Sequence, residues 1–377
     1  MWPFRRREER SLPFGAFVGP SGTLPTWAGA TVDTDTAMRL SAVWACVRLL
    51  GDTVSTLPVD VYRRGERAPI ATPPVLVEPA AGIPAHEFLY STMTSLLLRG
   101  NAYGLITARS GATLLPAQLE LVHPDKVSVT VDPDGRVAYR LLGREVDRAD
   151  VWHVRAFTMP GAVVGLSPVE YARQSIGLGL AAEKFGAQFF GDNATPSGLL
   201  TTPERLHQSD ADRLALQWKA AHQGSRNPAV LSGDLKFTPI SVSPDDSQFV
   251  ETAQLNVAQV ARVFGVPPEM VGAASSGSNV TYANVEARAL DFLRYSVSPW
   301  LVRLESALGR LLPAKQFVRF NTGGLLRADT RSRYEAHKVA LDAGFLTVDE
   351  VRELEDRPPF APAAAGGPQL DNETGVA

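Results

Sequence analysis

The chain has 377 residues, of which 45% are hydrophobic and 20% are charged, a composition typical of a folded protein with two or three domains' worth of length. Its formal net charge of −3, from 37 basic and 40 acidic residues, excludes a strongly basic nucleic-acid coat and leaves room only for local or weak contact with DNA. The single cysteine, Cys46, excludes intrachain disulfides and multi-cysteine zinc sites. It lies in an apolar stretch, where we expect a buried thiol rather than a nucleophile.

Residues 1–32 are interpreted as an extended N-terminal arm. Three arginines at positions 5–7 are followed by no apolar region, so we do not expect a secretory signal here. The uncharged stretch 11–32 contains Pro13, Pro20 and Pro25, which would break a membrane-spanning helix whose freed backbone groups lipid cannot satisfy. No membrane partner is therefore expected.

Segment 33–166 predicts an α+β domain. Helix-capping residues begin at Asp33, and apolar residues then recur at intervals of three and four from Leu40 to Leu57, which indicates one helix face. A second helix is expected at 84–99. The expected strands are 59–62, 102–108, 126–131, 137–142 and 151–157.

A long helix is expected to start at Ser167-Pro168 and to run to about residue 192. It contains small residues, among them Gly177, Gly179 and Gly186. Because each glycine costs about 1 kcal/mol inside a helix, their presence suggests that something packs very close to this helix.

Short elements follow in 194–243: strands at 198–201, 229–231 and 236–240, and a helix at 209–222. The next helix begins after Ser243-Pro244 and ends before Gly265. Its apolar stripe is a regular series with helical spacing: Phe249, Ala253, Val257, Val260 and Phe264.

The stretch 270–285 carries no charge at all, yet it is rich in small polar residues. One reading is a flexible surface loop. The other is a surface that slides past a polyanion without gripping it. The small and polar residues in question are Ser275, Ser276, Gly277, Ser278, Asn279 and Thr281.

A long helix is predicted at 284–312, with a kink near Tyr295 because Pro299 lies inside it. A strand at 317–321 follows, then two short helices at 330–343 and 347–355. The tail 361–377 is expected to be disordered.

The sequence contains no recognisable catalytic or cofactor-binding motif. No lysine follows a glycine, so a P-loop is absent, and no Gly-x-Ser-x-Gly elbow occurs. The six histidines are scattered, so we expect neither a metal site nor a cofactor. Paired carboxylates occur, but each pair is explained by its position in a turn or at a helix end. The chain therefore reads as a binding or structural protein and not an enzyme, with a hydrolase that has an unrecognised carboxylate site as an alternative.

Several segments then resemble one family. Two segments carry most of the resemblance: Val260-Ala261-Arg262-Val263-Phe264-Gly265-Val266-Pro267-Pro268-Glu269-Met270 and, after it, Thr281-Tyr282-Ala283-Asn284-Val285-Glu286. They are similar to the portal proteins of long-tailed double-stranded-DNA bacteriophages. The stretches 100–104, 189–198, 321–326 and 348–352 agree in the same order, so the resemblance covers roughly residues 33–360.

The resemblance implies an α+β portal subunit with a wing at 33–166, stem helices at 167–193 and 244–265, a clip at 194–243 and a tunnel loop at 266–283. A long kinked helix with the closing strand of the wing (284–326) and a small helical crown (327–360) complete it. It also implies a ring of about twelve copies at one vertex of the capsid, assembled in the host cytoplasm. Another ring-forming head–tail adaptor is the alternative within structural proteins.

The partners implied by the resemblance are the chain itself, double-stranded DNA bound without sequence specificity, the terminase large subunit, the head–tail adaptor, the major capsid protein and the scaffold. ATP hydrolysis would belong to the terminase, and the ring would be a passive channel for DNA entry and exit.

The resemblance also assigns residues to these parts. The tunnel loop would contact DNA through Ser275, Ser276, Gly277, Ser278, Asn279, Thr281 and Tyr282. The clip would contact terminase or adaptor through Arg226 and Lys236. Stem packing between subunits would use Gly177, Gly179, Gly186, Phe249, Val257 and Val260.

Overall fold

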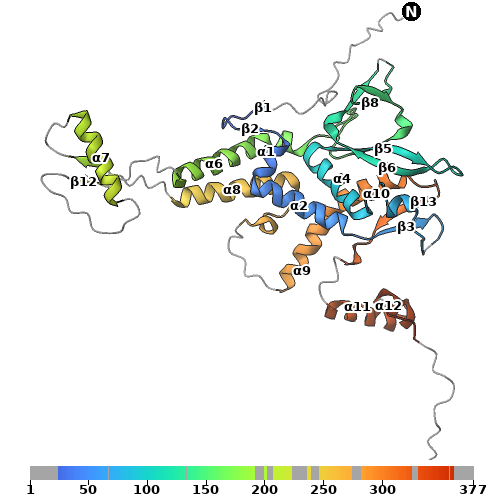
Figure 1. Ribbon diagram of the computed structural model, residues 1–377. Helices are drawn as coiled ribbons and strands as arrows, with labels where there is room; N and C mark the ends of the chain where they lie inside the picture. Colours follow the sequence, from blue (N-terminus) through green and yellow to red (C-terminus); the bar gives the residue numbers. More distant parts are fainter. Residues whose placement is uncertain are drawn as a thin grey trace, which may run out of the picture. The chain divides into compact units, whose positions relative to one another are not determined.

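The computed structural model describes residues 24–66, 68–132, 134–191, 199–201, 207–222, 236–238, 246–273, 282–324, 330–355 and 357–360. The described residues form two compact units. One is drawn from 24–273 and 291–320, and the other from 282–290 and 321–360. Both helices and small antiparallel sheets are present (Figure 1), which confirms the predicted α+β class.

The core of the larger unit is built on helices α2 (Ser41–Ser55) and α4 (Ala85–Arg99), which pack against each other. On α2, residues Val43, Val47, Leu50 and Val54 follow the three-four spacing of one helix face and are fully buried. Truncating Leu50 to alanine would cost about 2 to 5 kcal/mol of stability. Helix α8 (Asp246–Phe264) also contacts α2, and α10 (Ser298–Gly309) contributes Leu304 and Leu308 to the same core.

The expected helix start at Asp33 is a separate short helix, α1 (Thr34–Arg39). Asp33 caps it by accepting from the backbone N–H of Thr36 at 2.7 Å. At Leu40 the backbone becomes extended, with ψ of 119°, so α2 starts afresh. Cys46 lies on α2 and is completely buried, and burial raises the pKa of its thiol to about 12. The expectation of a buried thiol is confirmed.

Three sheets complete the larger unit. β5 (Asn101–Arg109) lies between β10 (Val151–Arg155) and β6 (Pro116–Val122). The predicted strand at 317–321 is β13 (Gln316–Phe320), which pairs with β3 (Val59–Arg63); β4 (Pro69–Ile70) follows β3 in that sheet. The predicted hairpin is β7 (Val127–Val131) and β8 (Val137–Leu141), extended by β9 (Arg144–Val146). A short helix, α3 (Pro74–Val77), packs on β6.

The described end of the predicted N-terminal arm is folded. β1 (Leu24–Pro25) pairs with β2 (Thr31–Val32), and the backbone N–H of Trp27 donates to Oε1 of Gln174 at 3.1 Å. The interpretation of 24–32 as an extended arm was therefore wrong. A tight turn with Gly29 at a φ of 76° folds this segment back, and the side chain of Thr26 is buried.

The predicted helix from Ser167 is two helices, α5 (Pro168–Tyr171) and α6 (Arg173–Gly191), joined at Ala172. Helix α6 lies beside α8 (Figure 1). Of the short elements between them, the structure describes β11 (Leu199–Thr201), which pairs with β12 (Lys236–Thr238), and α7 (Gln208–His222). The strand expected at 229–231 lies outside the described residues.

The predicted break near Tyr295 is a π-helical segment, Phe292–Val297, between α9 (Tyr282–Asp291) and α10. Pro299 has no backbone N–H and its ring would clash with the carbonyl of Tyr295 in a regular α-helix. The wider turn avoids this, and both the backbone N–H and the hydroxyl of Ser298 donate to the carbonyl of Leu293.

The smaller unit contains the two short helices expected near the C-terminus, α11 (Thr330–Asp342) and α12 (Val348–Leu354). Thr347 and Glu350 form a reciprocal capping box at the start of α12. The carboxylate of Glu355 accepts from Arg333 and from Nε2 of His337 at 3.0 Å, which ties the end of α12 to α11.

Candidate functional site

The candidate site is the pair of helices α6 and α8, where the sequence suggested unusually close packing. Gly179 of α6 faces Asn256 of α8, and a Cβ added at Gly179 would lie 2.4 Å from the Oδ1 atom of Asn256. Asn256 is buried, and its Nδ2 donates to the carbonyl of Ser175 at 2.8 Å. The missing Cβ therefore admits a buried side chain that bonds the two helices together.

Gly177 makes a second close approach inside the same chain. A Cβ there would lie 2.5 Å from Thr26 of the β1–β2 turn. Gly186 is buried, Val257 packs partly buried against the core, and Val260 is completely buried within it. Gly177, Gly179 and Val260 thus contact their own chain, which corrects the sequence-based expectation that they pack between subunits. A glycine signals a close neighbour but not which element supplies it.

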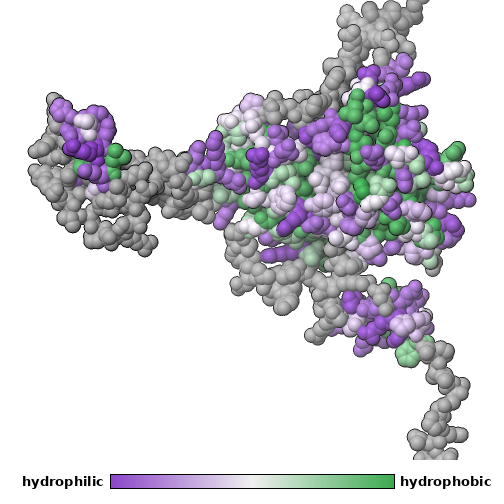
Figure 2. All heavy atoms as spheres, viewed as in Figure 1, coloured by the Kyte–Doolittle hydropathy of each residue, from purple (hydrophilic) through white to green (hydrophobic). Residues whose placement is uncertain are grey.

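Large apolar side chains are exposed elsewhere on the pair. Tyr171 at the end of α5 and Leu178 and Phe185 on α6 are spaced seven residues apart and are 56%, 45% and 56% exposed. Leu255 on α8 is 57% exposed. Figure 2 shows apolar atoms among the polar ones over α6 and α8. A seven-residue apolar spacing is typical of helix faces that pack against other helices, and this signal in the sequence was overlooked.

The direction of α5 is fixed by a buried hydrogen-bond cluster. Ser167 caps α5 and donates its hydroxyl to the carbonyl of Leu98 at 2.7 Å. Two residues earlier, the N–H and C=O of Gly165 bond to the amide side chain of Asn101 at 2.7 and 2.9 Å. The stretch 100–104, which carries part of the family resemblance, therefore holds the loop that leads into α5.

His153 completes this cluster. Its Nε2 lies 3.0 Å from Oδ1 of Asn101, and its Nδ1 lies 3.1 Å from the hydroxyl of Tyr139. Because that Asn101 oxygen can only accept, Nε2 carries the proton and Tyr139 donates to Nδ1. Burial, and then the positive charges of Arg155 and Arg310, lower the pKa of His153 from 6.5 to about 3. The imidazole is therefore neutral in the folded protein at pH 7.

This depressed pKa predicts acid sensitivity. Since the unfolded chain takes up the proton near pH 6.5 and the folded chain only near pH 3, the stability contributed by neutral His153 is complete above pH 6.5 and is lost progressively as the pH falls toward 3. We expect a loss of about 2 kcal/mol between pH 6.5 and 5 from this residue.

The measurement is urea unfolding at several pH values, with His153→Gln as the comparison, because glutamine retains a donor and an acceptor but does not titrate. The wild type should lose more stability than His153→Gln on acidification. Equal losses of stability in the two proteins would contradict the assignment of the acid sensitivity to His153.

The segments expected to contact DNA and terminase are described only at their margins. Helix α8 ends at Phe264, Gly265 follows with φ of 68°, and the 3-10 turn Pro268–Val271 comes next. Tyr282 is the first residue of α9, and Lys236 is an exposed first residue of β12. Phe249 lies on α8. Outside the described residues lie Arg226, Ser275, Ser276, Gly277, Ser278, Asn279 and Thr281.

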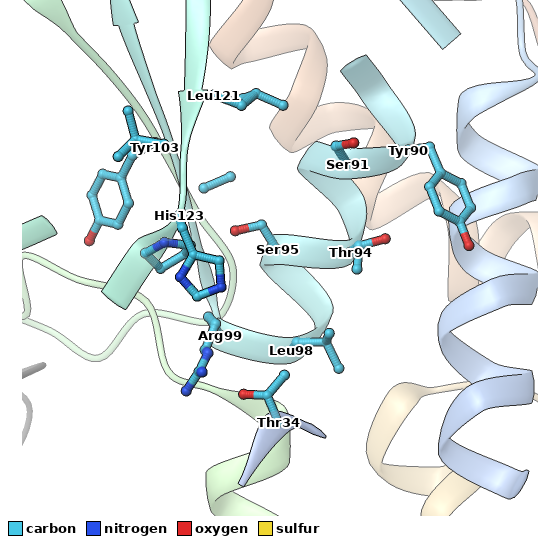
Figure 3. Close-up of a pocket in the computed structure, with 13 residues that line it drawn as sticks. Thr34, Tyr90, Ser91, Thr94, Ser95, Leu98, Arg99, Tyr103, Leu121 and His123 are labelled. Carbon is cyan, nitrogen blue, oxygen red and sulfur yellow. The ribbon is translucent and has the colours of Figure 1, made fainter. Parts of the chain in front are cut away.

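A cleft of about 440 Å³ lies between α4 and the strands β5 and β6 (Figure 3). Two of its polar groups have structural partners: the hydroxyl of Ser95 donates to the carbonyl of Asn101 at 2.6 Å, and Nδ1 of His123 accepts from the N–H of Asp125. Arg99 and Asp125 form an ion pair at 2.6 Å across the rim. These bonds position the strands and do not join a nucleophile to a base.

Within the described residues, no group of three histidine, cysteine or carboxylate side chains is placed to hold a metal ion. Among the same residues, no helix combines the length and the apolar character needed to cross a membrane.

Comparison with known proteins identifies relatives of this chain. A family model described as phage portal protein matches residues 41–356. A probable portal protein of Streptomyces phage phiC31 is 36% identical, over 88% of this chain and 78% of that protein. This chain belongs to the phage portal protein family. The portal protein of Enterobacteria phage HK97 is also similar, at 27% identity over 92% of this chain and 85% of the relative.

Solved structures share the portal fold. A chain from the virion of a native gene transfer agent particle is 25% identical, with a TM-score of 0.63 over 90% of this portal chain and 97% of the other. An HK97-family phage portal protein from Corynebacterium diphtheriae matches at 19% identity, with a TM-score of 0.55, over 78% and 96% of the two chains. The expected family, fold class and role as a portal protein are confirmed.

Proposed function

We propose that this portal chain assembles with copies of itself into a ring of about twelve subunits at one vertex of the capsid, with an axial channel for double-stranded DNA. A similar chain, 24% identical, belongs to a gene transfer agent neck whose structure was computed with C12 symmetry. The ring is a passive channel and a docking platform, and it forms part of the virion after assembly in the host cytoplasm.

The observation that carries the ring is the exposed apolar face of the α6–α8 pair. Leu178 and Leu255 are each about half exposed, whereas the glycine face of α6 is filled by Thr26 and Asn256 of the same chain. A helix pair that has closed one face internally and still exposes large apolar side chains has a surface suited to a further helix. In a closed ring, the neighbouring subunit supplies that helix.

In this proposal the uncharged segment that follows α8 lines the channel. Ser275 to Tyr282 would contact DNA sterically without reading its sequence, because each phosphate that a cation neutralises strengthens the hold on moving DNA. Segment 194–243, with Arg226 and Lys236, would meet the terminase large subunit and later the head–tail adaptor. Segment 33–166 would face the major capsid protein and the scaffold, and 327–360 would form the crown.

Charge placed on the exposed α6 face should prevent ring formation. We expect Leu178→Asp to leave the chain folded but to shift it from rings to monomers or small oligomers, because an aspartate in an apolar contact would have to be desolvated without a partner. Native mass spectrometry with negative-stain images of the same sample measures both the copy number and the axial hole.

Leu142→Asp is the matched control. Leu142 is 72% exposed in the turn between β8 and β9 and has a φ of 49°, a conformation that aspartate tolerates well. This variant should form the same rings as the wild type. Rings of Leu178→Asp with wild-type copy number would contradict the proposed contact, and a bore too narrow for a duplex would favour a head–tail adaptor without DNA passage.

A further inference from the structure

A second cleft, distinct from the helix pair, is lined by four arginines. It has a volume of about 520 Å³ and lies among β5, β8, β10 and the residues that follow α10. Arg109 comes from β5, Arg148 from the 3-10 turn before β10, Arg155 from β10, and Arg310 from the end of α10. We call this the arginine cleft.

Three of these arginines have no carboxylate partner in the part of the chain that the structure describes. Arg109 pairs with Asp150 at 2.7 Å. In contrast, Arg155 donates to the carbonyl of Ala162 at 3.1 Å, and Arg310 donates to the carbonyl of His153 at 2.7 Å. Neutral carbonyls position these guanidinium groups without cancelling their charge, so the cleft holds a concentrated positive field.

Other groups in the cleft respond to this field. Burial, followed by repulsion from Arg155 and Arg148, lowers the pKa of Arg310, with Tyr139 acting in the opposite direction. Tyr139 and His153 line the same cleft, and no carboxylate is among the charges that act on Arg310. Like charges held together cost free energy that a bound anion would relieve.

The cleft walls favour one class of anion. Leu114, which is 71% exposed, lines the cleft together with Val163 and Leu311. Guanidinium groups bind carboxylates and phosphates bidentately, but a DNA duplex offers phosphates on a stiff outer surface and no apolar side chains to meet these walls. A peptide segment that carries both acidic and apolar residues can satisfy both, and the volume falls within the usual range for ligand sites.

We propose that the arginine cleft binds an acidic peptide segment of a partner protein, with Arg148, Arg155 and Arg310 holding its carboxylates and Leu114 and Leu311 contacting its apolar side chains. This site does not depend on the proposed DNA channel. A protein that docks here would be released by salt, because the attraction is largely electrostatic.

The test measures fluorescence anisotropy of a labelled peptide made of Glu-Leu-Glu repeats, at low ionic strength, against full-length protein. We expect Arg148→Glu to weaken binding at least about tenfold. The matched control is Arg144→Glu, an exposed arginine on β9 outside the cleft lining with the same change in net charge. It should bind within about twofold of the wild type.

A DNA duplex with the same label is measured in parallel. The proposal is overturned if the wild type does not bind the peptide, if Arg144→Glu weakens binding as much as Arg148→Glu, or if the duplex binds more tightly than the peptide and is lost in Arg148→Glu. Arg148→Ala provides a second variant without charge reversal, and thermal melts establish that each variant is folded.

Discussion

Gly100→Ala should destabilise the folded chain by about 4 kcal/mol or more. Gly100 ends α4 with φ of 72°, and a Cβ there would lie 2.1 Å from the carbonyl oxygen of Leu166. The left-handed conformation alone costs a non-glycine residue about 1 to 2 kcal/mol. The clash is with backbone, which cannot rotate away, so the loop leading to Ser167 would have to move and break its bonds to Asn101.

Gly82→Ala is the control that separates the cost of the left-handed conformation from the cost of the clash. Gly82 has nearly the same φ, 74°, but nothing lies within 4 Å of an added Cβ. This control should lose only about 1 to 2 kcal/mol, the conformational cost. Urea unfolding followed by circular dichroism gives both values. Similar losses in the two variants would mean that the approach of Gly100 to Leu166 is not as close as described.

Gly179→Leu should cost about 3 kcal/mol or more, because the added side chain collides with Asn256 and displaces its buried hydrogen bond to Ser175. The control is Gly309→Leu in α10, where nothing lies within 4 Å of an added Cβ. That variant should stay within about 1 kcal/mol of the wild type, since leucine is the better helix former. Thermal unfolding of the two proteins side by side is the measurement.

A second substitution, at Asn256, tests whether the collision with that residue causes the loss of stability. If the collision with Asn256 causes the loss, Gly179→Leu combined with Asn256→Ala should lose less stability than the sum of the single variants. Additive losses would instead assign the damage to another neighbour, such as Leu40, whose Cδ2 lies 3.0 Å from the added Cβ.

Helices with a regular apolar face were predictable from the sequence. The expected helix at 84–99 is α4, Ala85–Arg99, and the expected stripe from Phe249 to Phe264 lies on α8. Local signals determine both, namely spacing and a terminating glycine. Strand β6 was missed because it begins at Pro116, which sequence reasoning treats as a breaker but which an edge strand tolerates.

The sites were less predictable, because they join residues far apart in the chain. Asn101, Tyr139 and His153 meet only after β5, β8 and β10 have packed, and each looks ordinary in its own segment. The same holds for Arg148 and Arg310 of the arginine cleft. Glycines on α6 did signal close packing, but only the tertiary fold shows that Thr26 and Asn256 occupy the space.

The π-helical segment Phe292–Val297 has a consequence for how chain length can vary in evolution. Its turn holds one residue more than an α-helical turn. In a relative without a proline at position 299, a one-residue deletion within it can therefore be absorbed by a return to α-helical bonding, whereas a deletion at the start of α10 would rotate the following residues by about 100°. Leu304 and Leu308 would then leave the core. Portal relatives that gain or lose a residue in this helix should do so within these six positions.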